Sequence, residues 1–182
     1  MPSPIAHLSV GYLLYQFFAR RISFRREKAG HFSHLLLIAV FLFLSMAPDL
    51  DSVVGIFTNQ MGRYHNNWTH SIVACIGISL IGTAFLQLII RNRLLSFVAA
   101  ISCCGLHIIM DFLSHGRGVM LLWPFTNHRF SPPFYLFMGL HWDKEIWCPL
   151  HILTIINELL FVVILIAIIK LSRLFKVQGW GR

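Results

Sequence analysis

Hydrophobic residues along the chain are gathered into long runs, and polar residues fall between the runs. Residues 71–90, 94–115 and 149–169 are each long enough to cross a bilayer, which takes about 20 apolar residues. A dense apolar run covers residues 34–47, and a shorter one covers residues 5–19. We therefore expect an all-α, polytopic membrane protein with about five membrane helices, the first of them short.

Composition agrees with this pattern. The chain has 182 residues, of which 57% are hydrophobic and only 12% are charged, whereas about a quarter would be charged in a soluble domain. The length suits one domain, so we treat residues 1–182 as a single membrane-embedded unit. Three of the four cysteines lie inside apolar runs, and their spacing matches neither a zinc ribbon nor a disulfide framework.

The net charge of +8 is distributed as in cytoplasmic loops rather than as in a nucleic-acid surface. Basic clusters follow the first, third and fifth apolar runs, which predicts that the N-terminus is outside and the C-terminus inside. The loops at residues 49–69 and 116–148 then share the outer side. We expect no nucleic-acid partner. The basic residues are Arg20, Arg21, Arg25, Arg26, Lys28, Arg91, Arg93, Lys170, Arg173, Lys176 and Arg182.

Histidines and aspartates gather at the predicted outer face. His107 and Asp111 are four residues apart, so on a helix both side chains share one face, with their Cβ atoms about 5–6 Å apart. Ionisable residues in membrane segments are candidate functional residues because they are costly there. The topology was derived without these side chains, yet it brings eight of them together: His7, Asp49, Asp51, His65, His70, His107, Asp111 and His115.

Histidine and aspartate are ligands of zinc and of non-haem iron or manganese. We predict that His7, Asp49, His65, His70, His107 and Asp111 bind the metal directly, with one to three ions, zinc first and Mn²⁺ or Fe²⁺ as alternatives. Asp51 is expected to bridge ions, to orient a histidine or to act as the catalytic base. Either Thr69 or Ser71 is expected to cap the helix that follows.

Structural interpretations stay open for the same residues. His107 and Asp111 suit a hydrogen-bonded pair between helices, the two loop aspartates suit a polar helix stop, and His7 suits an interfacial residue. Four further residues are candidates for additional ligands or for groups that hold ligands: His115, His141, Glu145 and Glu158.

Four motifs in order resemble the YdjM-like inner-membrane metal-dependent hydrolases. They are Ala6-His7, then Ala47-Pro-Asp-Leu-Asp51, then His65-Asn-Asn-Trp-Thr-His-Ser71, and last His107-Ile-Ile-Met-Asp111 with Gly118-Val-Met-Leu-Leu-Trp-Pro124. More remotely, the order of histidines and carboxylates is similar to that of zinc-dependent phospholipase C and P1-type nucleases. The chain departs from the family pattern at Asn66-Asn67, where Arg-Gly is usual, and at Ser52, where His is usual.

The resemblance implies a bacterial inner-membrane hydrolase, and the position of the site predicts a lipid or lipid-linked phosphoester as substrate at the periplasmic or outer face. Metal-activated water would be the nucleophile. Three arginines are candidates for phosphate recognition: Arg63, Arg117 and Arg129.

Two rival functions are weighed. A metal transporter would need polar groups throughout the membrane depth, and residues 94–101 and 159–169 are almost purely apolar. The other rival is a non-catalytic interaction protein with a structural metal.

Overall fold

The computed structural model describes residues 2–25, 30–58, 64–140 and 148–178. Within that part of the chain all regular structure is helical, and the only β-type pairs are isolated bridges. Two short 3-10 turns, η1 and η2, flank the helix α3. The helices are α1 (Pro4–Ala19), α2 (His31–Met46), η1 (Ala47–Leu50), α3 (Asp51–Phe57), η2 (Trp68–His70), α5 (Ile72–Leu86), α6 (Arg93–Phe112) and α7 (Pro149–Gln178).

Local sequence signals explain where several helices begin. Ser3 accepts a hydrogen bond from the backbone N–H of Ile5 at the start of α1, and Pro4 occupies the first turn. Ser71 caps α5, because its hydroxyl accepts a hydrogen bond from the N–H of Ala74 at 3.1 Å. Of the two residues predicted as the cap, Thr69 and Ser71, the cap is therefore Ser71. Asn92 caps α6 in the same way.

The chain beyond Pro48 differs from the sequence prediction. We expected a polar loop from residue 49, but α2 continues through η1 into α3. Proline removes one backbone donor, and a 3-10 turn at that point keeps the chain helical at the cost of one α-helical hydrogen bond. As a result Asp49 and Asp51 lie on a helical segment, with their side chains buried.

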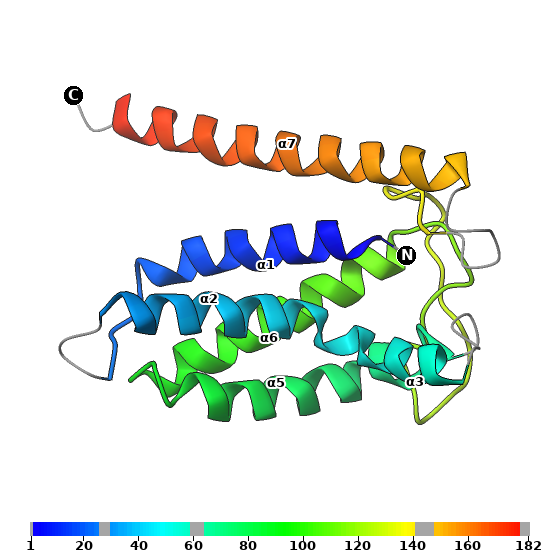
Figure 1. Cartoon of the computed structure of the whole chain (residues 1–182), viewed down its shortest axis with the longest axis horizontal. Helices are drawn as coiled ribbons and strands as arrows, with labels where there is room; N and C mark the ends of the chain where they lie inside the picture. The colour runs from blue at the N-terminus through cyan, green and yellow to red at the C-terminus, as the bar shows by residue number, and fades with distance from the viewer. Residues whose placement is uncertain (1, 26–29, 59–63, 141–147, 179–182) are drawn as a thin grey trace.

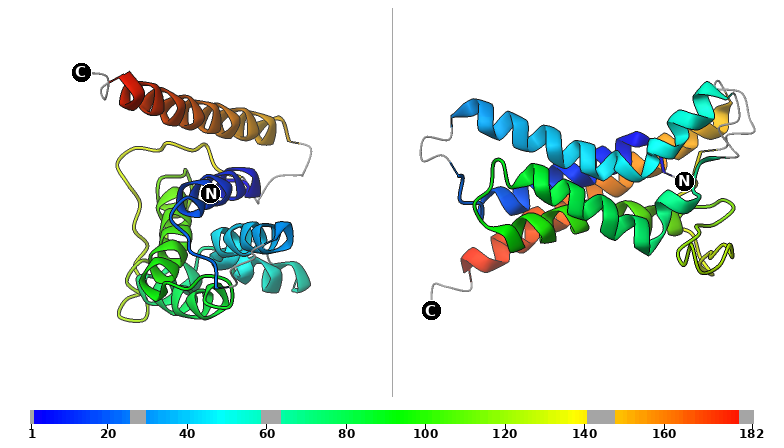
Figure 2. Two further views of the ribbon diagram at one scale, coloured as in Figure 1. Left: turned by 90° about the vertical axis from the view of Figure 1, so that its left-hand side faces the viewer. Right: turned by 90° about the horizontal axis from the view of Figure 1, so that it is seen from below.

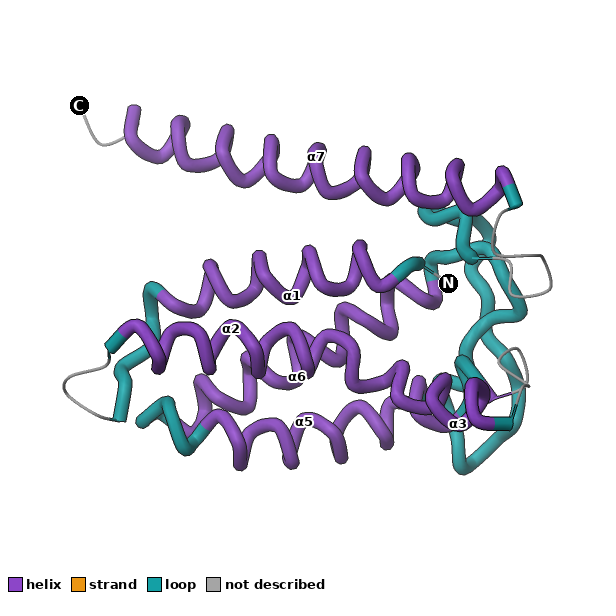
Figure 3. Tube along the Cα trace, viewed as in Figure 1, coloured by secondary structure: helices purple, strands orange, loops and turns teal. Residues whose placement is uncertain are grey.

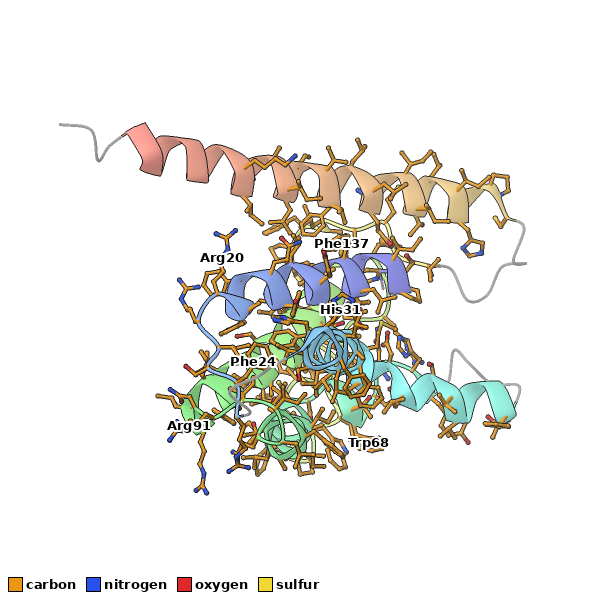
Figure 4. The ribbon with its side chains drawn as sticks, turned by 60° about the vertical axis from the view of Figure 1, so that its left-hand side comes forward. Arg20, Phe24, His31, Trp68, Arg91 and Phe137 are labelled. Carbon is orange, nitrogen blue, oxygen red and sulfur yellow. The ribbon has the colours of Figure 1, made fainter. Side chains whose placement is uncertain are left out.

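Helices α1, α2, α5 and α6 pack side by side, and α7 lies along the outer side of α1 (Figures 1 and 2). Buried side chains from all four bundle helices form the largest core cluster, which includes Phe18, Phe41, Leu86 and Ala99. Phe137, in the loop after α6, packs edge-on against Phe161 of α7 with ring centroids 4.9 Å apart (Figure 4).

The α1–α2 and α5–α6 connections meet at one end of the bundle, where Arg20 and Arg91 lie (Figure 4). The N–H of Arg25 donates to the carbonyl of Ile89, and the N–H of Arg91 donates to the carbonyl of Ser23. The loops after α3 and α6 lie at the opposite end, as the teal segments in Figure 3 show. Arg20 and Arg91 therefore lie at the end of the bundle opposite the buried acidic residues of the predicted site (Figure 4).

Three helical stretches of the described chain are long and apolar enough to cross a membrane: His31–Gly55, Arg93–Phe112 and Pro149–Lys170. Ile72–Leu86 is a shorter apolar helix. Large apolar side chains such as Phe43, Ile81 and Val163 are exposed, which suits surfaces that face lipid. The all-helical class is confirmed and three candidate spans are present in the described chain, while the number of five membrane helices and the orientation across the membrane stay predictions.

Candidate metal centre

Seven of the predicted site residues lie together in the interior at one end of the bundle. Donor atoms of Asp49, His65, His70 and Asp111 are mutually close, and donor atoms of His7, Asp49 and His107 form a second group. Both groups contain Asp49. The six residues of these two groups come from α1, η1, the turn before η2, η2 and α6, and the seventh, Asp51, begins α3.

One oxygen of Asp49 occupies the centre of the arrangement. Its Oδ1 atom lies 3.2 Å from Nε2 of His107, 3.4 Å from Nε2 of His70 and 3.5 Å from Nε2 of His65. No hydrogen bond to this oxygen occurs within the described residues, although the side chain is only 8% exposed. A buried carboxylate oxygen without a hydrogen bond costs free energy unless something else compensates it.

Hydrogen bonds to the opposite ring nitrogens aim three imidazoles at this oxygen. Nδ1 of His107 donates to the carbonyl of Ser45 at 2.7 Å, because a carbonyl can only accept. Nδ1 of His65 lies 2.9 Å from Oδ1 of Asp51, and Nδ1 of His70 lies 3.0 Å from the hydroxyl of Thr69. With each Nδ1 so occupied, a neutral ring presents its Nε2 lone pair to the centre, as a metal ligand does.

Asp111 and His7 complete the site on the side of α1 and α6. Asp111 places Oδ2 2.9 Å from Nε2 of His70 and Oδ1 3.3 Å from Nε2 of His7. The ring of His7 stacks on that of His107 with centroids 3.9 Å apart. His7 is 1% exposed, and neither ring nitrogen makes a hydrogen bond with another described residue.

The donor spacing fits metal ions. Ligand atoms held about 2.0–2.2 Å from a tetrahedral ion lie about 3.3–3.6 Å from one another. Two of the three contacts of Asp49 Oδ1, at 3.4 and 3.5 Å, fall within that range, and the third, at 3.2 Å, lies just below it. The donor set of imidazole and carboxylate is the one used by zinc, manganese and non-haem iron. Each of the two groups that share Asp49 could hold an ion.

Asp51 lies beside the centre, behind two of its histidines. It belongs to neither group of donor atoms. Its Oδ1 accepts from His65, and its Oδ2 accepts from the hydroxyl of Thr69 at 2.5 Å. Asp51 therefore orients histidines, which was one of the three roles predicted for it, and this geometry does not favour its prediction as a ligand or base.

Electrostatics at the site favour protonated His70 when no cation is present. Burial by itself would lower the pKa of His70, but its contacts with Asp111, Asp49 and Asp51 outweigh that effect and raise the pKa well above the usual value. A positive charge is therefore stabilised at the centre of these carboxylates. A divalent cation would supply that charge and displace the proton.

Two arginines cover the outer side of the centre. Arg117 donates to the carbonyl of His65, and Arg129 donates to the carbonyl of Asn66 at 2.9 Å and to the side chain of Asn67. Burial lowers the pKa of both groups; the nearby Asp51 opposes this for Arg117, and the charge of Arg117 adds to it for Arg129. The two like charges therefore lie near each other beside the candidate metal centre.

Other predicted residues lie away from the centre. His115 is exposed and packs against the ring of Tyr135. Glu158 is fully buried and accepts from the N–H of Ser3 at 2.6 Å and from its hydroxyl, so it joins α7 to the start of α1. The candidates Arg63, His141 and Glu145 lie outside the described residues.

Two members of the site were missed in the sequence. Thr69 was considered only as a helix cap, yet its hydroxyl joins Asp51 to His70. The carbonyl of Ser45 orients His107, and a backbone acceptor has no signal in the sequence. For Thr69 a signal existed, because a hydroxyl next to His70 suits the support of its ring.

Comparison with known proteins gives one family. The family model described as YdjM inner membrane protein matches residues 1–178. Neither the curated proteins nor the solved structures include a match.

Proposed function

This chain belongs to the YdjM inner membrane protein family, and on that premise we propose that it is a membrane-bound, metal-dependent hydrolase. The observation that supports this most directly is Oδ1 of Asp49, buried without a hydrogen bond and facing three Nε2 atoms. Without metal this oxygen would depend on the charge of protonated His70, whose Nε2 lies 3.4 Å away, whereas ions at the centre would be bound by it directly.

The chain's own residues supply ligands and their supports. Asp49 and Asp111 lie close to donors of both groups and would be shared, with His65 and His70 on one side and His7 and His107 on the other. When bound, two such ions would activate a water molecule near neutral pH and neutralise charge on a phosphoryl group.

The proposed reaction is hydrolysis of a phosphoester in a lipid or lipid-linked substrate. Arg117 supports this choice, since it is exposed beside the centre and, among the described residues, its guanidinium with five donors makes one hydrogen bond. Arg129 lies next to it, and an anion bound near both guanidinium groups would stabilise the two positive charges.

A structural metal centre is the second candidate, because all seven residues are buried, and structural sites are closed whereas catalytic ones keep a position open. The composition favours catalysis. Structural zinc sites use mainly cysteine, but Cys75, Cys103 and Cys104 lie in the helices, outside both groups of donor atoms. Metal transport has less support, since the donor groups lie at one end of the bundle only.

The deciding experiment is metal analysis combined with a turnover assay. Protein purified without chelators should hold zinc, manganese or iron and should release phosphate from dipalmitoyl phosphatidic acid. Chelation should abolish release and readdition of metal should restore it. Metal content clearly below one ion per chain would refute the proposal, and metal without turnover on any phosphoester would favour the structural centre.

The proposed location at the outer face of the inner membrane has its own test. Ser131 lies in the loop at the end that holds the site, and Asn92 lies in the connection at the opposite end; both are exposed. Cysteines at these positions, in a background without native cysteines, should be labelled in intact cells at Ser131→Cys and protected at Asn92→Cys. The reverse pattern would invert the orientation.

A further inference from the structure

An apolar groove of about 600 Å³ lies between α2 and α5, on the flank of the bundle away from α7. Leu44 and Gly82 lie at its floor, where a Cβ atom at Gly82 would come within 2.5 Å of the Leu44 side chain. Exposed residues form its rim, among them Phe43, Ile81 and Phe85, which are 58–63% exposed. These rim residues belong to the apolar surface that would face lipid.

The groove reaches the metal centre through a single turn of chain. In η1, Leu50 and Ala47 line the groove, while Asp49 of the same turn faces the histidines. Thr69 also belongs to both, because it lines the groove and its hydroxyl contacts Asp51 and His70. A molecule lying in the groove would therefore end beside the proposed ligands.

The length of the groove matches one leaflet of a bilayer. Its lining on α2 and η1 runs from Ala39 to Leu50, which is about 17 Å at helical rises. The hydrocarbon core of a bilayer is about 30 Å thick. Trp68 lies at the end nearest the centre, with its ring 6.0 Å from that of Trp123, on the side of α3 and α5 (Figure 4). Tryptophans prefer the headgroup level.

We infer that this groove holds an acyl chain of the lipid substrate, with the headgroup at the metal centre. The inference rests on the proposed hydrolase and specifies how its substrate binds. A transmembrane helix from a partner is a poorer fit, because it would need a groove along the full membrane depth. An acyl chain needs one leaflet, an apolar lining and a polar end, and the groove offers all three.

The test uses two alanines that are both exposed toward lipid. Ala39 lines the end of the groove that is farthest from the metal centre, and Ala84, on α5, does not line the groove. Ala39→Trp should shorten the groove, and Ala84→Trp is its matched control. Retention of dipalmitoyl and dihexanoyl phosphatidic acid is measured by native mass spectrometry of the full chain, with metal content determined on the same samples.

Ala39→Trp should bind the dipalmitoyl lipid about tenfold more weakly than wild type, which corresponds to about 1.4 kcal/mol, and should bind the dihexanoyl lipid as wild type does. Ala84→Trp should resemble wild type with both. Equal behaviour of the two variants would overturn the inference, as would loss of a bound polypeptide rather than a lipid from Ala39→Trp. If the protein held no metal or showed no turnover, but the two lipids still differed in this way, the proposed hydrolase would be refuted. The assignment of the groove as an acyl-chain site would stand.

Discussion

Nδ1 of His107 donates a 2.7 Å hydrogen bond to the carbonyl of Ser45, and this bond fixes which nitrogen of His107 faces the centre of the bundle. Because the acceptor is a backbone carbonyl, Nδ1 must carry the proton, and the neutral ring then offers Nε2 as a lone pair toward Asp49. A backbone carbonyl of α2 thus orients a proposed metal ligand on α6. The arrangement of the centre depends on this kind of support across helices.

Metal stoichiometry should report the two donor groups separately. Wild-type protein is expected to hold about two ions per chain. Asp49→Asn should lose both, because Asp49 belongs to both groups, whereas His65→Ala and His7→Ala should each lose one. The measurement is metal analysis of purified protein. His115→Ala is the control and should retain wild-type content, since His115 lies outside both groups; equal losses in all four variants would contradict the two-group arrangement.

Asp51→Asn should weaken metal binding without abolishing it. Asp51 orients His65 and accepts from Thr69, and loss of such support lowers affinity by about 10–100-fold. Titration against a chelator of known affinity measures the change, and Thr69→Val should shift affinity in the same direction. If Asp51→Asn kept full affinity and lost only turnover, Asp51 would instead be the base that the sequence suggested.

The effect of pH on metal binding should follow from His70. Its pKa in the metal-free protein is raised, so a metal ion must displace a proton from it at pH values below that pKa. Affinity should therefore rise with pH, by about tenfold per pH unit for each proton displaced. Isothermal titration in buffers of different ionisation enthalpy counts the released protons, and pH-independent affinity would contradict this.

Stability of the metal-free protein should change in the opposite direction. A raised pKa means that protonated His70 stabilises the fold fully below its unfolded pKa of about 6.5, and that this contribution is lost as pH rises through the folded pKa. The increase in Tm on adding metal should accordingly grow with pH. Thermal unfolding in detergent, with and without chelator, makes the comparison.

Arg117→Ala should impair substrate binding and leave metal content unchanged. Arg117 makes one hydrogen bond to the loop, through the His65 carbonyl, and the lost charge-assisted bonds to a phosphate correspond to about 10–100-fold in KM. Arg129→Ala is the informative comparison, because Arg129 bonds the carbonyls of Asn66 and Gly118 and should act chiefly on the loop. An unchanged KM in Arg117→Ala would remove it from substrate recognition.

Close packing of α1 on α2 should be needed for the site. A Cβ atom at Gly11 would lie 2.8 Å from Cβ of Ser45, whereas one at Gly105 would meet nothing within 4 Å. Gly11→Ala should destabilise the protein by about 1–3 kcal/mol and displace His7 from the centre. Gly105→Ala is the matched control and should be neutral or stabilising by up to about 1 kcal/mol. Unfolding curves and metal content distinguish the two.

Periodicity and charge in the sequence determined the class of this protein. Long apolar runs satisfy their backbone hydrogen bonds in a bilayer by forming helices, so the approximate bounds of the five long helices followed from the positions of these runs. The spacing of His107 and Asp111 placed both on one helical face. The candidate ligands His7, Asp49, His65 and His70 followed from the argument that loops on one side of a membrane share a surface.

Tertiary structure decided what each of these residues does. The continuation of α2 through η1 turned Asp49 toward the centre and left Asp51 behind the histidines; the two residues are about half a turn apart on this helical segment, where the sequence predicted a loop. The support of His107 comes from the carbonyl of Ser45, 62 residues away, and every residue type has such an acceptor. Sequence can therefore indicate which side chains carry the chemistry, but their orientation depends on backbone groups that only the packed helices bring together.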